Sequence, residues 1–101
     1  MPPSPQHSAS VAAVIVNPHG QVLMTQRRDN GHWEPPGGVL ELAESIIDGL
    51  RREVREGTGI EIQPDQLTGV YKNMPRGIVA LVFRAHVIGG VPVARPTRRL
   101  G

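Results

Sequence analysis

The stretch of sequence that decides the fold runs from Gly38 to Ile60 and reads GVLELAESIIDGLRREVREGTGI. Its apolar residues fall within about 100° of one another when 3.6 residues make a helical turn. The four that form this stripe are Ile46, Ile47, Leu50 and Val54. This pattern predicts an amphipathic helix over residues 45–56, and Gly59 follows where a helix C-cap is expected.

Two glutamates of this helix border its apolar stripe. Glu53 and Glu56 lie about 60° apart on the helix, beside the core-facing side, whereas carboxylates that only aid solubility lie opposite it. Gly37 and Gly38 end the preceding loop, and glycine allows main-chain carbonyls to approach closely. Two carboxylates and a carbonyl form an all-oxygen site that suits Mg²⁺ or Mn²⁺. The alternative interpretation is a solvated helix face.

The same stretch carries a longer pattern of fixed spacings. The residues that define it are Gly38, Glu44, Arg52, Glu53, Val54, Glu56, Gly59 and Ile60. This pattern resembles the box of the Nudix family, Gx5Ex7REUxEExGU with U aliphatic, at eight of its nine fixed positions. The segment WEPPGG, residues 33–38, also resembles the family's approach to the box.

The resemblance implies a metal-dependent pyrophosphohydrolase that cleaves a nucleoside diphosphate linked to another moiety, with Mg²⁺ or Mn²⁺ as cofactor. Gly37 would offer a carbonyl to the metal, Glu56 would be a metal ligand, and Glu53 would be a ligand or the catalytic base. Glu44 and Arg52 would support the loop and the helix. The metal would neutralise charge on the diphosphate and orient a water.

One fixed position of the box departs from the family pattern. Gly57 stands where the family has the second glutamate of its EE pair, which is a principal metal ligand. The loss of this carboxylate predicts weaker metal binding and impaired activity, with water taking the vacant position. It also keeps an alternative open, which is a non-catalytic nucleotide-binding or interaction domain, or a truncated inactive fragment.

Other segments predict strands and loops around the helix. The expected elements are a β-hairpin of strands 11–16 and 22–25, a loop over 28–38, a strand over 67–72, a connection over 73–77, and the longest strand over 78–88. Together with the resemblance, they predict an α/β fold of the Nudix type, an α/β/α sandwich with a mixed sheet.

Both ends of the chain look different from its centre. Residues 1–10 hold three prolines and predict a disordered leader, residues 11–88 predict the Nudix-like domain with its box at 38–60, and residues 89–101 predict a basic tail rich in Pro and Gly. This tail offers neither the C-terminal strand nor the C-terminal helix that the resemblance implies. We therefore expect exposed apolar surface, covered by a partner such as a second copy forming a homodimer.

Composition limits the class of protein. The chain has 101 residues, 11 Lys and Arg, 9 Asp and Glu, and no Cys. These values predict one small domain, exclude a disulfide scaffold, and favour a reducing cytoplasm. No apolar run approaches the ~20 residues of a membrane span. Three of the arginines lie in the tail, where a solvated terminus is a commoner explanation than nucleic-acid contact.

A few further side chains are weaker candidates for substrate contacts. Trp33 lies in the loop before the box and fits base stacking or a core anchor equally well. Arg27 could bind a substrate phosphate, although a solvent-exposed strand end is the commoner explanation. Lys72 and Arg76 are hints of the same kind. No histidine has a second potential metal ligand at a spacing typical of metal sites. We therefore expect the histidines to be ordinary surface or hydrogen-bonded residues.

Overall fold

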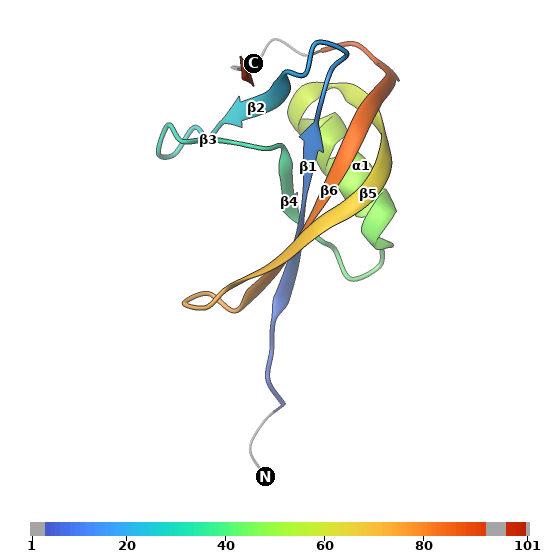
Figure 1. Cartoon of the computed structure of the whole chain (residues 1–101). Coiled ribbons are helices and arrows are strands. Elements are labelled where there is room, and N and C mark those ends of the chain that lie inside the picture. The colour runs from blue at the N-terminus through green and yellow to red at the C-terminus, as the bar shows by residue number, and fades with distance from the viewer. Residues whose placement is uncertain (1–3, 93–96, 101) are drawn as a thin grey trace.

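The structure is a computed structural model that describes residues 4–92 and 97–100. These residues form two β-sheets and one helix (Figure 1). In chain order the elements are β1 (Ser8–Ile15), β2 (Val22–Gln26), β3 (Trp33–Glu34), β4 (Gly37–Val39), α1 (Ile46–Thr58), β5 (Ile60–Asn73), β6 (Ile78–Gly90) and β7 (Thr97–Leu100). The larger sheet has the order β4-β1-β6-β5, and the smaller has the order β3-β2-β7. Because β1 and β6 are parallel and the other neighbours are antiparallel, the larger sheet is mixed, which confirms the predicted α/β class.

Capping fixes both ends of α1. Ser45 is the N-cap, and its hydroxyl accepts a hydrogen bond of 3.1 Å from the backbone N–H of Asp48. Gly59 is the C-cap at φ 77°, in the left-handed region that glycine adopts without steric cost. The predicted helix is confirmed, although it begins at Ile46 and continues through Thr58.

The core lies between α1 and the larger sheet. Its fully buried apolar residues are Val11, Ala13, Ile15, Leu50, Val54, Ile62 and Ala85. Two residues of the apolar stripe, Ile46 and Ile47, are not part of this core, since they are 42% and 36% exposed. The sheet covers only the later turns of α1, so Leu50 and Val54 carry the packing while the first turn faces solvent.

The strand predictions need several corrections. β5 begins directly after the helix cap and has 14 residues, so the predicted strand 67–72 is only its second half. β6 has 13 residues and is therefore not the longest strand. Pro64 and Asp65 do not interrupt β5, because a register shift between Pro64 and Gln66 accommodates them as an irregularity in the pairing with β6.

The predicted N-terminal hairpin does not form. β1 and β2 lie in different sheets and share only one isolated bridge, Val16 with Val22. Instead β1 lies between β4 and β6, because its alternating buried residues face α1 and both of its edges are then paired. The predicted loop 28–38 contains β3 and the start of β4, which pair with β2 and β1 through their backbones.

The predicted boundaries of the two tails were also wrong. Ser8 already pairs with Ile78, so β1 begins inside the predicted leader 1–10. β6 extends to Gly90, two residues into the predicted tail 89–101. β7 also lies within this tail and pairs with β2, so a C-terminal strand is present. Backbone pairing needs no apolar pattern, which is why no pattern in residues 97–100 indicated β7. In 4–92 and 97–100, no helix is long and apolar enough to span a bilayer.

Apolar surface is exposed along β5 and β6, as expected for a sheet with one incompletely covered face. The large hydrophobic side chains exposed on these two strands are Leu67, Val70, Tyr71, Val87 and Ile88. A second helix to cover them is not among the elements of the described residues.

Candidate functional site

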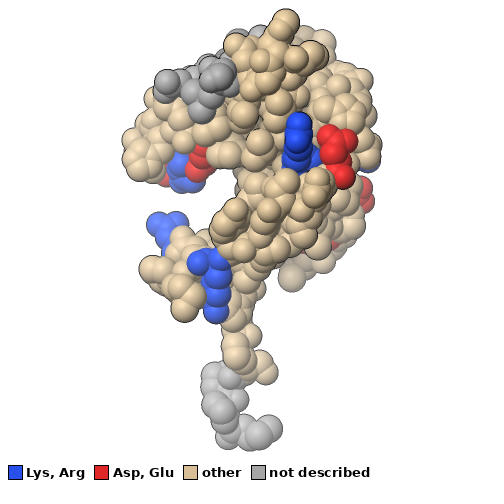
Figure 2. All heavy atoms as spheres, viewed as in Figure 1, with Lys and Arg blue, Asp and Glu red and all other residues tan. Residues whose placement is uncertain are grey.

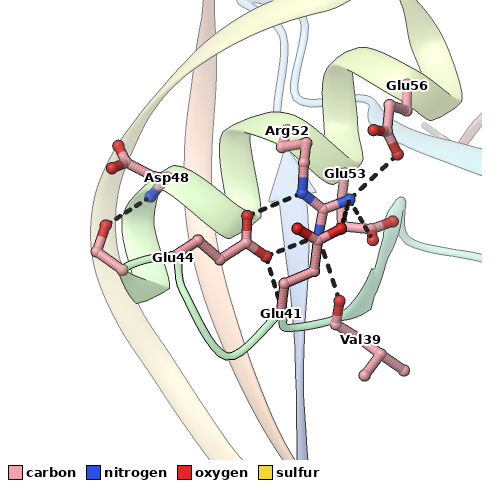
Figure 3. Close-up of polar contacts among 8 residues, drawn as sticks. Val39, Glu41, Glu44, Asp48, Arg52, Glu53 and Glu56 are labelled. Atoms are coloured by element: carbon pink, nitrogen blue, oxygen red, sulfur yellow. Dashed lines mark hydrogen bonds and ion pairs between the residues drawn. The ribbon is translucent and has the colours of Figure 1, made fainter.

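Arg52 of α1 organises the polar side chains at the start of the helix (Figure 3). Its Nε donates to Glu44 Oε2 at 2.8 Å, and its Nη2 donates to Glu44 Oε1 at 2.7 Å, a paired geometry that orients both groups. Glu44 also accepts a 2.9 Å hydrogen bond from the backbone N–H of Glu41. The Arg52 hydrogen bonds, followed by that of Glu41, lower the pKa of Glu44 to about 2.

The same guanidinium reaches the two glutamates that the sequence singles out. Arg52 Nη1 donates to Glu53 Oε1 at 2.9 Å and to Glu56 Oε2 at 3.2 Å. The Glu53 side chain is 19% exposed and that of Glu56 is 61% exposed. One arginine therefore joins the loop before the helix to both candidate acids, and it holds each acid by a single oxygen (Figure 3).

The carboxylate of Glu53 lies against Gly38 of β4. A Cβ on Gly38 would fall on the Glu53 carboxyl group, with Oε2 as the nearest atom. Glu53 Oε2 has no hydrogen-bond partner among the described residues. Gly38 pairs with Val11 of β1 and Gly37 with Ala12, so the strand pairing places this backbone beside the helix glutamate.

Gly57 lies in the last turn of α1, beyond the two glutamates. A Cβ built on it meets no atom within 4 Å, so this position has room for a side chain. Among residues 4–92 and 97–100, no group of three or more His, Cys, Asp or Glu side chains is placed to hold a metal ion. The oxygen donors of the candidate site are thus the carboxylates of Glu53 and Glu56 and the backbone of Gly37 and Gly38. Such hard donors suit an ion that takes its remaining ligands from water and phosphate oxygens.

A cleft of about 420 Å³ opens next to Gly38. Its lining includes Arg27, Glu34, Gly37, Gly38 and Arg76. Figure 2 shows a notch with basic side chains on both sides, between the β5–β6 hairpin and the region of β2 and β3. Gly38 both lines this cleft and lies against Glu53, whereas Glu53 and Glu56 are not themselves among the residues that line it.

The two predicted substrate-contact residues differ in their placement. Arg27 lines the cleft, but its guanidinium pairs with Asp29 at 2.5 Å and with Glu34 at 3.5 Å. These carboxylates raise the pKa of Arg27 and neutralise its charge locally. Trp33 is half-buried in β3 and is not one of the residues that line the cleft.

Sequence reasoning did not select Val39 or Glu41, and it named Arg76 only as a hint of a phosphate contact. The carbonyl of Val39 accepts a 3.3 Å hydrogen bond from Arg52, and Glu41 lies 3.9 Å from the same guanidinium. Arg76 reaches the cleft from a turn far along the chain, so no local pattern links it to the helix. The pairing of β6 with β1, which also pairs with β4, brings that turn to the cleft.

The chain matches one family model and is similar to several known proteins. The NUDIX domain family model matches residues 6–95. A MutT-like protein of Streptomyces ambofaciens is 60% identical over 87 residues, which cover 86% of this chain and 56% of that protein. The 8-oxo-dGDP phosphatase NUDT18 of Danio rerio is 45% identical over 83 residues, covering 79% of this chain and 25% of that protein.

Two further similarities extend the comparison. The ADP-ribose pyrophosphatase of Methanocaldococcus jannaschii is 33% identical over 91 residues, covering 83% of this chain and 54% of that protein. The crystal structure of a MutT NUDIX hydrolase from Burkholderia pseudomallei superposes with a TM-score of 0.82 at 25% identity, covering 94% of this chain and 83% of that one. The chain therefore spans about half the length, or less, of these curated relatives.

Proposed function

Since the chain belongs to the Nudix family, we propose that it is a metal-dependent hydrolase that cleaves the diphosphate linkage of a nucleoside diphosphate compound. The observation that carries this proposal is the contact between Gly38 and Glu53 at the wall of an open cleft. A substrate in that cleft would have its diphosphate beside Gly38, against which the Glu53 carboxylate lies. Relatives named for hydrolysis of phosphate anhydrides support this reaction class.

Nudix hydrolases generally need a divalent ion such as Mg²⁺ or Mn²⁺. The donor set supports such an ion here, because Glu53 Oε2 is unpaired and lies beside the Gly37–Gly38 backbone. We assign Glu53, Glu56 and the Gly37 carbonyl as its ligands. When bound, the ion would offset charge on the diphosphate and lower the pKa of a water.

The chain's own residues have separate roles in the proposed reaction. Glu53 or Glu56 accepts the proton of the attacking water at a carboxylate oxygen. Arg52 keeps both glutamates in place from one side, and Glu44 fixes Arg52 through the paired contact. Because Gly57 supplies no third carboxylate, a bound ion would keep more of its water, and activity at low metal concentration would be reduced.

A second function is favoured by one observation, namely that no group of three acidic or histidine side chains in the described residues is placed around a metal. A chain with this feature would bind a nucleotide without cleaving it, or act as an interaction domain. The exposed apolar residues of β5 and β6 support a second copy as partner in either case. A cytoplasmic location is part of the proposal, because the sequence has no Cys.

Product release from a panel of nucleoside diphosphate compounds, with EDTA or with millimolar Mg²⁺ or Mn²⁺, tests the proposed function. The panel includes nucleoside diphosphates and ADP-ribose, and circular dichroism confirms that each sample is folded. Metal-dependent release of a nucleoside monophosphate is the expected result. A folded chain that releases no product with either ion, but binds the same nucleotides, would establish the second function instead.

A further inference from the structure

The cleft beside Gly38 is lined by charged side chains, of which some form ion pairs and one does not. Arg27 and Glu34 both line it, and they pair with each other at 3.5 Å, with Asp29 binding Arg27 from outside. Arg76 also lines the cleft and is exposed, yet no carboxylate of the described residues pairs with it. Arg76 is therefore the charged lining residue whose side chain has no ion-pair partner among the described residues.

The backbone of Arg76 is held in place by its turn. Its N–H donates to Asn73 Oδ1 at 3.4 Å, and the N–H of Gly77 donates to the Asn73 carbonyl at 2.9 Å. Gly77 has φ 63°, which glycine adopts without strain, and its carbonyl accepts a 3.1 Å hydrogen bond from Ser8 of β1. The turn is thus tied to the sheet that carries Gly38, so little ordering is needed before Arg76 binds an anion.

The two ends of the cleft have different chemistry. One wall has Gly37 and Gly38, next to the carboxylate of Glu53, where the proposed function places the diphosphate. Arg76 comes to the same cleft from the β5–β6 hairpin. A guanidinium binds phosphate oxygens through its planar fork of N–H groups, and a terminal phosphate carries close to two negative charges at neutral pH.

We infer that Arg76 binds the terminal phosphate of the substrate, so that the preferred substrate is a nucleoside diphosphate with a free terminal phosphate rather than a diphosphate capped by a neutral sugar. This inference rests on the proposed function and specifies its substrate class. In the reaction, water adds to one phosphorus and the bridging P–O bond breaks. The products are a nucleoside monophosphate and inorganic phosphate, with the proton of the water passing to a carboxylate.

ADP and ADP-ribose provide a matched pair of probes, because they differ only at the end of the diphosphate. Isothermal titration in EDTA measures the binding of each probe to the full chain without turnover. We expect wild type to bind ADP more tightly than ADP-ribose. Arg76→Ala should weaken ADP binding at least about tenfold, since a hydrogen bond to a charged group is lost, and should change ADP-ribose binding less than about twofold.

Two further variants control for charge and geometry. Lys72→Ala removes a positive charge from the same hairpin outside the cleft, and it should leave both dissociation constants within about twofold. Arg76→Lys keeps the charge but loses the planar fork, and an intermediate affinity for ADP is expected. Unfolding curves check that all variants are folded.

Several outcomes would overturn the inference. These are tighter binding of ADP-ribose by wild type, equal weakening of both probes by Arg76→Ala, an equal effect of Lys72→Ala, or no binding of either probe. The proposed function is judged separately by turnover with Mg²⁺. Arg76-dependent binding of ADP, with no turnover of any compound in the panel, would refute the hydrolase and support the inference. Turnover of ADP that is unaffected by Arg76→Ala would support the hydrolase and refute the inference.

Discussion

The carboxylate of Glu53 occupies the space in which a side chain on Gly38 would stand. This contact joins β4 to α1 and sets the glutamate against Gly38, which lines the cleft. Glycine is required here because of a close approach between two elements. The absence of a side chain at Gly38 therefore allows β4 to pack against α1 and leaves room for the Glu53 carboxylate.

Substitution of Gly38 by alanine should displace Glu53. The added Cβ meets the carboxyl group, so either the side chain rotates away or β4 moves from α1. We expect turnover to fall at least about tenfold and the midpoint of thermal unfolding to drop. Gly57→Ala is the matched control, because its Cβ meets nothing within 4 Å. That variant should gain up to about 1 kcal/mol of unfolding free energy through helix propensity. Equal activities for the two variants would contradict this role of Gly38.

Gly57→Glu should strengthen metal binding. Position 57 has open space, and a glutamate there would add a third carboxylate to the end of α1. The metal concentration that gives half-maximal activity should fall at least about tenfold, because a water ligand is replaced by a charged oxygen.

Gly57→Gln separates charge from helix stabilisation in this comparison. The neutral variant should gain a similar unfolding free energy, since glutamine and glutamate have similar helix propensities. It should show little change in metal dependence. If both variants shift the metal titration alike, position 57 is not near the bound ion.

The pairing of Glu44 with Arg52 should make stability depend on pH. The folded-state pKa of Glu44 is lowered from 4.5 to about 2, so its stabilising effect is complete above 4.5 and is lost as pH falls toward about 2. Thermal unfolding of wild type and Glu44→Gln should therefore differ most near neutral pH. The difference between their midpoints should shrink as pH is lowered through this window, and a constant difference would show that charge is not its cause.

Leu50 should dominate the packing of α1 on the sheet. It is fully buried, whereas Ile46, one turn earlier, is 42% exposed. Leu50→Ala should lower the unfolding free energy by about 2 to 5 kcal/mol, measured by urea denaturation. Ile46→Ala should cost less than about 1 kcal/mol. Similar losses at both positions would mean that the first turn is buried in solution.

Sequence patterns predicted the elements whose signals are local. The spacing of Leu50 and Val54, together with the cap at Gly59, was enough to predict α1, and the box spacing placed Glu53 and Glu56 on it. Strand pairing was harder to predict, because it depends on contacts between distant residues. Nothing near Ser8 or in β7 indicates a partner, and both segments pair through backbone groups that every sequence has.

Among the polar contacts, too, those between residues close in sequence were easier to predict than those between distant residues. Sequence reasoning placed Glu44 and Arg52 together as supports, and the structure joins them by two hydrogen bonds. It named Arg76 only as a hint of a phosphate contact, because the turn of a long hairpin brings this residue to the cleft that Gly38 lines. Three-dimensional proximity of residues about 40 positions apart has no signal in one sequence. The roles of the candidate metal ligands stay predictions.

Binding of Mn²⁺ to the folded chain, followed by its electron paramagnetic resonance signal, is the decisive measurement for the proposed metal site. Wild type should bind the ion, and a variant with both Glu53→Gln and Glu56→Gln should bind it at least about tenfold more weakly. Glu61→Gln, which removes a carboxylate that pairs with Arg55, serves as the control and should bind like wild type. Unchanged Mn²⁺ binding in the double variant, or no binding in wild type, would contradict the proposal that two glutamates suffice to hold the ion.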